Sequence, residues 1–107
     1  MHAREEFFLT FLVLSIGCPA EVGAPSDPAA QRGRDVYLAN CTACHNADPS
    51  LPGPVGPEIK GSPRELIEAR VMRAAYPPGY VPKRATTLMQ PLPQLQDGID
   101  DLAAYLR

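Results

Sequence analysis

The 107-residue sequence contains no tryptophan and no run of basic residues, and its twelve acidic residues outnumber its ten lysines and arginines. A formal net charge of −2 gives no electrostatic footprint for nucleic acid, so we expect no nucleic-acid partner. The sequence also lacks an uninterrupted apolar run of about 20 residues, the length that a membrane-spanning helix needs. These absences argue against a nucleic-acid-binding protein and against a membrane-spanning helix.

The longest apolar run, residues 7–16, lies near the N-terminus and is followed by small residues. Its length is typical of the apolar region of an export signal. A buried helix is the alternative, but Gly17 and Pro19 end the run with helix breakers and the run has no polar face. We therefore expect residues 1–18 to be a signal peptide and residues 19–28 to be a flexible tether. The mature protein is then exported and periplasmic.

Cys18 directly follows Gly17 at the end of this segment, and the pattern resembles a lipoprotein signal, in which the cysteine becomes the lipidated first residue. Ordinary signal cleavage after Ala20 or Ala24 is the alternative. The lipoprotein interpretation accounts for a thiol that would otherwise be an odd exported cysteine. It predicts anchorage to a membrane surface through Cys18.

The remainder of the chain carries three helical patterns and no convincing strand. An aspartate followed by a proline predicts a helix over residues 28–40. A capping box at residues 62–65 opens a second helix, which Pro77 and Pro78 end. An apolar stripe predicts a last helix over residues 97–106.

Two long irregular stretches, residues 46–61 and 79–96, separate these helices. A mature chain of this size builds only a marginal core from its own side chains. Long loops in so small a domain favour a bound group that the loops wrap. We expect one all-α domain over residues 29–107.

Residues 41–45 read Cys-Thr-Ala-Cys-His, which is the C-x-x-C-H motif of covalent haem attachment. Two thiols about one helical turn apart reach the two vinyl groups on one edge of the porphyrin. The adjacent histidine then lies under the iron as its proximal ligand. The motif predicts one haem c bound through Cys41 and Cys44, with His45 as an iron ligand.

Two other functions of a C-x-x-C pair compete with this prediction. A thioredoxin-like redox pair needs a βαβ context, which the sequence does not provide. A zinc site needs further cysteine or histidine ligands, and the remaining candidates, Cys18 and His2, both lie in the presumed leader. The motif therefore favours haem.

The histidine count restricts the sixth ligand of the iron. Removal of the leader leaves His45 as the single histidine, so methionine becomes the leading candidate. Met72 lies on the predicted middle helix, where packing is the ordinary role of such a side chain. Met89 lies in a proline-rich irregular loop, which suits a thioether held over a haem face. We prefer Met89, with Met72 as the alternative.

Taken in order, these motifs resemble the small bacterial class I cytochromes c over about residues 31–106. The resemblance implies a three-helix cytochrome c fold wrapped around one covalently bound haem, with long irregular loops. It implies that Gly33 permits a close crossing of the first and last helices, with Tyr37 and Tyr105 packed near it. The matching features are Gly33, Tyr37, residues 41–45, residues 56–61, Met89 and residues 101–106.

The same resemblance implies that the carbonyl of Pro57 accepts a hydrogen bond from Nδ1–H of His45 and so orients the imidazole. The loop after the methionine departs from the family pattern, because Gln90 stands between Met89 and Pro91 where proline usually follows directly. This departure affects the expected geometry of the loop around Gln90 and leaves Met89 as the preferred ligand.

An iron with histidine and methionine ligands has no open site for a substrate, so we expect an electron carrier and not an enzyme. Its partners are a donor and an acceptor redox protein, and it acts as a monomer or as a small subunit. A cytochrome c subunit of a membrane-associated oxidoreductase complex is the alternative, followed by a peroxidase or gas sensor. Two pairs of residues keep two interpretations each. Lys83 and Arg84 either lie at the rim of the haem edge or are solvated loop charges. Tyr76 and Tyr80 either close the propionate side of the haem or belong to the core.

Overall fold

The structure, a computed structural model, describes residues 25–107. The predicted signal peptide over residues 1–18, Cys18 itself and most of the tether over residues 19–28 lie outside the described residues. Between residues 25 and 107 the chain forms three α-helices and one 3₁₀ helix with no strand, which confirms the all-α class. In chain order the helices are α1 (Pro28–Asn40), α2 (Arg64–Arg73), η1 (Pro93–Gly98) and α3 (Ile99–Leu106).

Helix α1 has the bounds that the sequence predicts. The Asp27 carboxylate caps its first turn by accepting a hydrogen bond from the Ala29 N–H at 3.3 Å, and Pro28 fills the first helical position. At the other end the N–H of Cys41 donates to the carbonyl of Tyr37 at 2.9 Å. The C-x-x-C-H motif therefore begins at the last turn of a well-defined helix.

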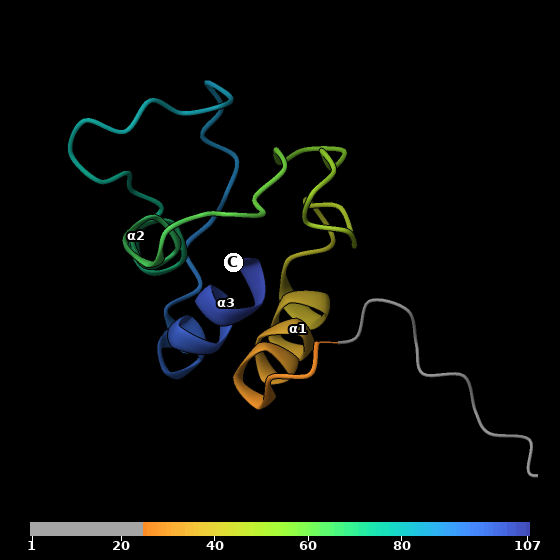
Figure 1. Ribbon diagram of the computed structural model, residues 1–107. Coiled ribbons are helices and arrows are strands. Elements are labelled where there is room, and N and C mark those ends of the chain that lie inside the picture. Colours follow the sequence, from red (N-terminus) through yellow and green to blue (C-terminus); the bar gives the residue numbers. More distant parts are fainter. Residues whose placement is uncertain (1–24) are drawn as a thin grey trace, which may run out of the picture.

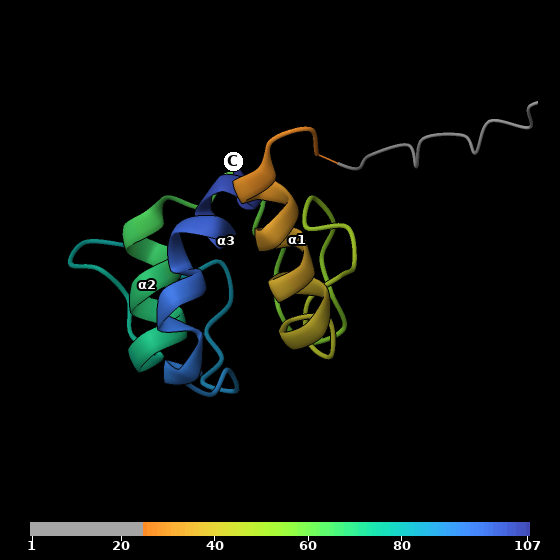
Figure 2. The same cartoon turned by 90° about the horizontal axis from the view of Figure 1, so that it is seen from below.

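Figure 2 shows α1 and α3 side by side, and the contacts of Gly33 with Asp101 and Tyr105 place it where the two helices cross. A Cβ atom at position 33 would overlap the backbone carbonyl of Asp101 and approach the Cβ of Tyr105. Next to the crossing, the fully buried ring of Tyr37 packs against that of Tyr105 with 5.6 Å between centroids. The expected close crossing and the expected packing of the two tyrosines are both confirmed.

Helix α2 begins and ends differently from the prediction. Its N-cap is Pro63 with no side-chain cap, because Ser62 Oγ instead donates to the carbonyl of Ile59 at 2.6 Å, so the expected capping box is wrong. The helix ends at Arg73, ahead of the prolines, because Ala74 adopts a left-handed conformation with φ of 52°. The N–H of Ala74 donates to the carbonyl of Arg70 at 3.0 Å, which is the single bond of an αL cap, and the N–H of Ala75 donates to the carbonyl of Ala69 at 3.0 Å.

The last helix also starts later than predicted. Residues 93–98 form the 3₁₀ helix η1, and α3 begins only at Ile99. Gly98 stands at the junction and offers no side chain to cap α3. A proline at the start of η1 and a glycine at its end explain why this segment forms a tight turn and not the first turn of an α-helix.

Figures 1 and 2 show α3 lying between α1 and α2. The buried core is formed where α1 and α2 pack against α3. Both irregular segments, which we term the histidine loop (residues 41–63) and the methionine loop (residues 74–92), extend to the same side of the helices in Figure 1. Among residues 25–107, no helix is long and apolar enough to cross a membrane. The core residues are Tyr37, Ile67, Val71, Ile99, Leu102, Ala103 and Leu106.

Candidate functional site

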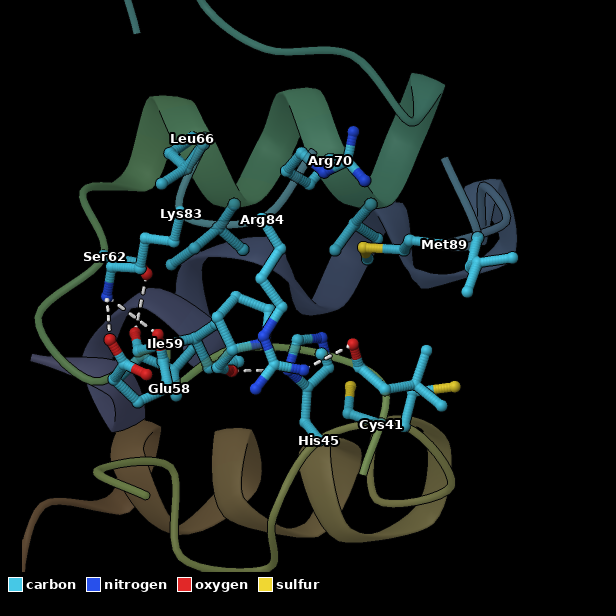
Figure 3. A pocket seen from close by; sticks show the side chains of 18 of the residues that line it. Cys41, His45, Glu58, Ile59, Ser62, Leu66, Arg70, Lys83, Arg84 and Met89 are labelled. Carbon is cyan, nitrogen blue, oxygen red and sulfur yellow. Dashed lines mark hydrogen bonds and ion pairs between the residues drawn. The ribbon is translucent and has the colours of Figure 1, made fainter. Parts of the chain in front are cut away.

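A cavity of about 300 Å³ lies between the two loops and the apolar face of the helices. Core residues of α2 and α3 form its apolar wall. Figure 3 shows side chains from both loops entering it. The structure thus brings together, around one cavity, all five site residues that the sequence predicts: Cys41, Cys44, His45, Pro57 and Met89.

His45 is held by hydrogen bonds to two parts of the chain. Its backbone N–H donates to the carbonyl of Cys41 at 2.9 Å, which continues the turn that follows α1. Its Nδ1 lies 3.0 Å from the carbonyl oxygen of Pro57, which is the contact expected from the sequence. Because a carbonyl oxygen only accepts, Nδ1 carries the proton in this contact, and in the neutral tautomer Nε2 then has the free lone pair. A neutral imidazole in this state is a metal ligand.

Two glycines let the histidine loop close tightly around His45. A Cβ atom at Gly56 would overlap the imidazole ring of His45, and one at Gly53 would overlap the backbone on either side of that residue. The N–H groups of Val55 and Gly56 both donate to the carbonyl of Cys44, at 3.2 and 2.8 Å. Sequence reasoning gave no role to Gly53 and named Gly56 only within a motif. Their position among prolines near the C-x-x-C-H motif was the available signal of close backbone approach.

The two thiols lie at one side of the cavity. Both are free, and the N–H of Cys44 donates to the carbonyl of Cys41 at 3.3 Å, which keeps the two residues within one tight turn. Burial raises the pKa of the Cys41 thiol to about 11, whereas Cys44 is exposed. At neutral pH the Cys41 thiol is therefore protonated and faces an apolar cavity.

Met89 enters the cavity from the opposite side. In Figure 3, His45 and Cys41 lie toward α1, whereas Met89 lies toward α2 with its sulfur directed inward. The N–H of Leu92 donates to the carbonyl of Val71 at 2.6 Å, which ties the chain just after Met89 to the end of α2 in spite of the intervening Gln90. The presence of Gln90 between Met89 and Pro91 therefore does not prevent the end of the methionine loop from being fixed to α2.

Met72, the alternative ligand, lies elsewhere. It packs against the core and lines a separate surface depression with Arg64 and Glu68. It does not line the cavity that contains His45. Of the two methionines, the structure places Met89 alone in the same cavity as the imidazole.

An aromatic and cationic wall completes the cavity. The guanidinium of Arg70 lies 4.2 Å from the centroid of the Tyr76 ring, and that ring stacks on Tyr80 at 5.5 Å. Both tyrosines line the cavity and Tyr76 is 36% exposed, so the view of them as core residues is wrong. Arg70 was not singled out from the sequence, although a cation next to Val71 on the apolar face of α2 was the available signal.

The charge of this wall is predominantly positive. Arg70, Lys83 and Arg84 all line the cavity, and Glu58 is the single acidic residue among its described lining residues. The backbone N–H of Glu58 and the ammonium of Lys83, 3.3 Å away, together lower the pKa of the Glu58 carboxyl. The part of the chain that the structure describes contains no cluster of three or more His, Cys, Asp or Glu side chains able to hold a metal ion. The excess of cations suits an anionic group near the cavity mouth.

Comparison of the chain with protein-family models, curated proteins and solved structures found no match. The motif at residues 41–45 and the geometry of the cavity are therefore the features that indicate a function.

Proposed function

We propose that the protein is a c-type cytochrome with a single haem that carries one electron at a time outside the cytoplasm. One observation carries the proposal. The imidazole of His45 and the thioether of Met89 enter one apolar cavity from opposite sides, and the two thiols of the C-x-x-C-H motif line the same cavity. These are the side chains that would hold a haem c through two thioether bonds and through histidine and methionine ligands to its iron.

The residues present fit haem in their chemistry. Cys41 and Cys44 provide the two sulfur atoms for thioether bonds, and both are free thiols. His45 presents a lone pair on Nε2 because its Nδ1–H is taken by Pro57. Cations at the cavity wall match the two carboxylates of a porphyrin.

The chain's own residues tune such a centre in identifiable ways. Haem iron bound by imidazole and thioether supplies a reversible one-electron couple. The carbonyl of Pro57 fixes the ring orientation of His45 and raises the basicity of the imidazole. The apolar wall formed by residues such as Ile67 and Leu102 disfavours the additional positive charge of the oxidised state.

His45 and Met89 would together hold the iron of the haem, which would leave no open site for a substrate. We therefore propose an electron carrier and not an enzyme. Its donor and acceptor are redox proteins that dock at an exposed edge of the site. A peroxidase or a gas sensor requires a free or labile position, and the placement of Met89 opposite His45 disfavours both.

The second candidate function is a cytochrome c subunit of a membrane-associated oxidoreductase complex. It is favoured by apolar side chains exposed on the methionine loop beside the cavity, since Val81 is 81% exposed and Leu88 is 63% exposed. Such side chains suit a lasting contact with a partner protein. Co-purification of a stoichiometric partner from the membrane fraction would favour the subunit, and recovery of the monomer alone would favour the carrier.

Location and anchorage form a separate part of the proposal. We propose an exported, periplasmic protein held at a membrane surface by lipidation of Cys18. Fractionation of cells that express the wild type or Cys18→Ala tests this. The wild type is expected with the membranes and the variant in the soluble periplasmic extract, and equal solubility of both would rule out the lipid anchor.

An optical spectrum of the purified, oxidised protein tests the ligand assignment. A weak far-red charge-transfer band is the mark of a sulfur ligand to ferric haem. We expect this band together with a low-spin spectrum. A high-spin spectrum without the band would contradict the carrier function.

A further inference from the structure

We propose that Lys83 and Arg84 act as positioning residues for His45 and Met89, by clasping the methionine loop to the segment that orients His45. The inference rests on the proposed haem function and deepens it. It assigns a role to two cations that the sequence left open between rimming the haem edge and solvation.

The clasp consists of hydrogen bonds to backbone carbonyls across the cavity mouth. Lys83 Nζ donates to the carbonyl oxygen of Glu58 at 2.8 Å and lies 3.3 Å from the Glu58 carboxylate. Arg84 Nη1 donates to the carbonyl oxygen of Val55 at 2.7 Å. In Figure 3 both side chains run from the methionine loop down to the histidine loop. Because the donors are charged, these bonds are stronger than bonds between neutral groups.

The two acceptors flank the residues that fix His45. Between Val55 and Glu58 lie Gly56, whose Cα faces the imidazole ring, and Pro57, whose carbonyl bonds to Nδ1. Bonds at both ends of this short segment restrict its movement toward or away from the ring. The clasp therefore acts on the imidazole through Gly56 and Pro57, and neither cation needs to touch it.

On its other side the clasp fixes the chain that leads to Met89. Within the described part of the chain, residues 81–88 make no hydrogen bond other than those of Lys83 and Arg84. The loop has a glycine with φ of 81° at position 79, and its next backbone anchor is Leu92 at the end of α2. Without the clasp, no hydrogen bond of residues 81–88 fixes the chain before Met89, which is then held by its packing against the core and by the Leu92 anchor. Its thioether then competes less well with an external ligand for the iron.

The test uses the full-length holoprotein, with imidazole as the external ligand of the oxidised haem. The variants are Lys83→Gln, Arg84→Gln and the double variant, each of which removes a charge. The conservative Arg84→Lys keeps a charged donor and checks for rescue. Arg73→Gln is the matched control, because Arg73 is an exposed cation that does not line the cavity.

We expect imidazole to bind about tenfold more tightly to the double variant than to the wild type, which corresponds to about 1.4 kcal/mol. Each single glutamine variant is expected to show a smaller increase, Arg84→Lys a partial return, and Arg73→Gln none. The far-red band should weaken in the same order. Helical circular dichroism and covalent haem content should stay unchanged, because the clasp lies outside the helices and the thioether bonds.

Equal imidazole affinity in the wild type and the double variant would overturn the clasp while leaving the haem assignment intact. An equal increase in Arg73→Gln would also overturn it, because charge alone would then explain the effect. Loss of helical signal in both single variants would assign the two cations to folding and not to ligand positioning. A wild type without bound haem would instead refute the proposed function, and the clasp with it.

Discussion

The Nδ1 atom of His45 and the carbonyl oxygen of Pro57 are 3.0 Å apart, and this contact joins the end of the C-x-x-C-H motif to a proline twelve residues later. Proline is well suited to this place because its backbone has no N–H to satisfy and its φ angle is fixed. The contact determines which nitrogen of the ring is available to a metal. It therefore turns a sequence motif into an oriented ligand.

Gly56 tests how closely the loop must approach this ring. A methyl group introduced by Gly56→Ala would overlap the His45 imidazole. We expect a loss of stability of about 1–3 kcal/mol and a lower yield of haem-bound protein. Denaturant unfolding and the ratio of haem absorbance to protein measure the two effects. Unchanged yield and stability would show that the loop readily moves away from His45.

Gly33 tests the helix crossing separately from the site. In Gly33→Ala the new methyl group would overlap the Asp101 carbonyl, so α1 and α3 must separate. We expect a fall in the free energy of unfolding of about 2 kcal/mol or more. Gly98→Ala is the control, because a Cβ there meets only ordinary contacts with Val36 at 3.6 Å and beyond. Equal stability of the two variants would contradict the close crossing.

The raised pKa of the Tyr37 hydroxyl predicts a loss of stability at alkaline pH. Burial raises the pKa of the Tyr37 hydroxyl from 10.0 to about 12, so between these values the unfolded chain releases this proton and the folded chain retains it. The folded state then binds more protons than the unfolded state, and its stability falls as pH rises through this window. Chemical unfolding measured from pH 9 to 12 should show this slope in the wild type.

Tyr37→Phe should remove that contribution to the slope. It should also lower the free energy of unfolding at neutral pH by about 1 kcal/mol, because the Tyr37 hydroxyl donates to the backbone carbonyl of Asn46. Tyr105→Phe, which alters the other ring of the same pair, is the control. The same alkaline slope in the wild type and Tyr37→Phe would mean that other groups cause the loss.

Met89 and Met72 offer a direct comparison of two thioethers. Met89→Ala should give a high-spin haem that binds external ligands and lacks the far-red band. Met72→Ala should keep the wild-type spectrum, because Met72 packs outside the cavity. Its free energy of unfolding should fall by no more than about 5 kcal/mol. The reverse pattern would make Met72 the ligand and would refute the arrangement of the site.

Much of the architecture is predictable because its signals are local. The start of α1 follows from Asp27 and Pro28, whose effects act within one turn. The end of α2 was missed because Ala74, and not a glycine, adopts the left-handed conformation. Arg70 stabilises this end by donating to the Ala74 carbonyl at 2.7 Å, an interaction that no sequence pattern indicates.

In the site, too, the local signals were predictable and the long-range contacts were not. Residues 41–45 are contiguous, so their motif can be recognised without a structure. The contacts of Arg70, Lys83 and Arg84 join segments whose relative position depends on the folded loops. Sequence reasoning named the last two cations but left their role open, and it gave no role in the site to Arg70.

Extraction of the purified exported protein with acidified organic solvent shows whether haem is covalently attached. In the wild type, haem colour should stay with the polypeptide. In the double variant Cys41→Ser with Cys44→Ser, any bound haem should pass into the solvent. Complete extraction of haem from the wild type, or a wild type isolated without haem, would refute covalent attachment through Cys41 and Cys44.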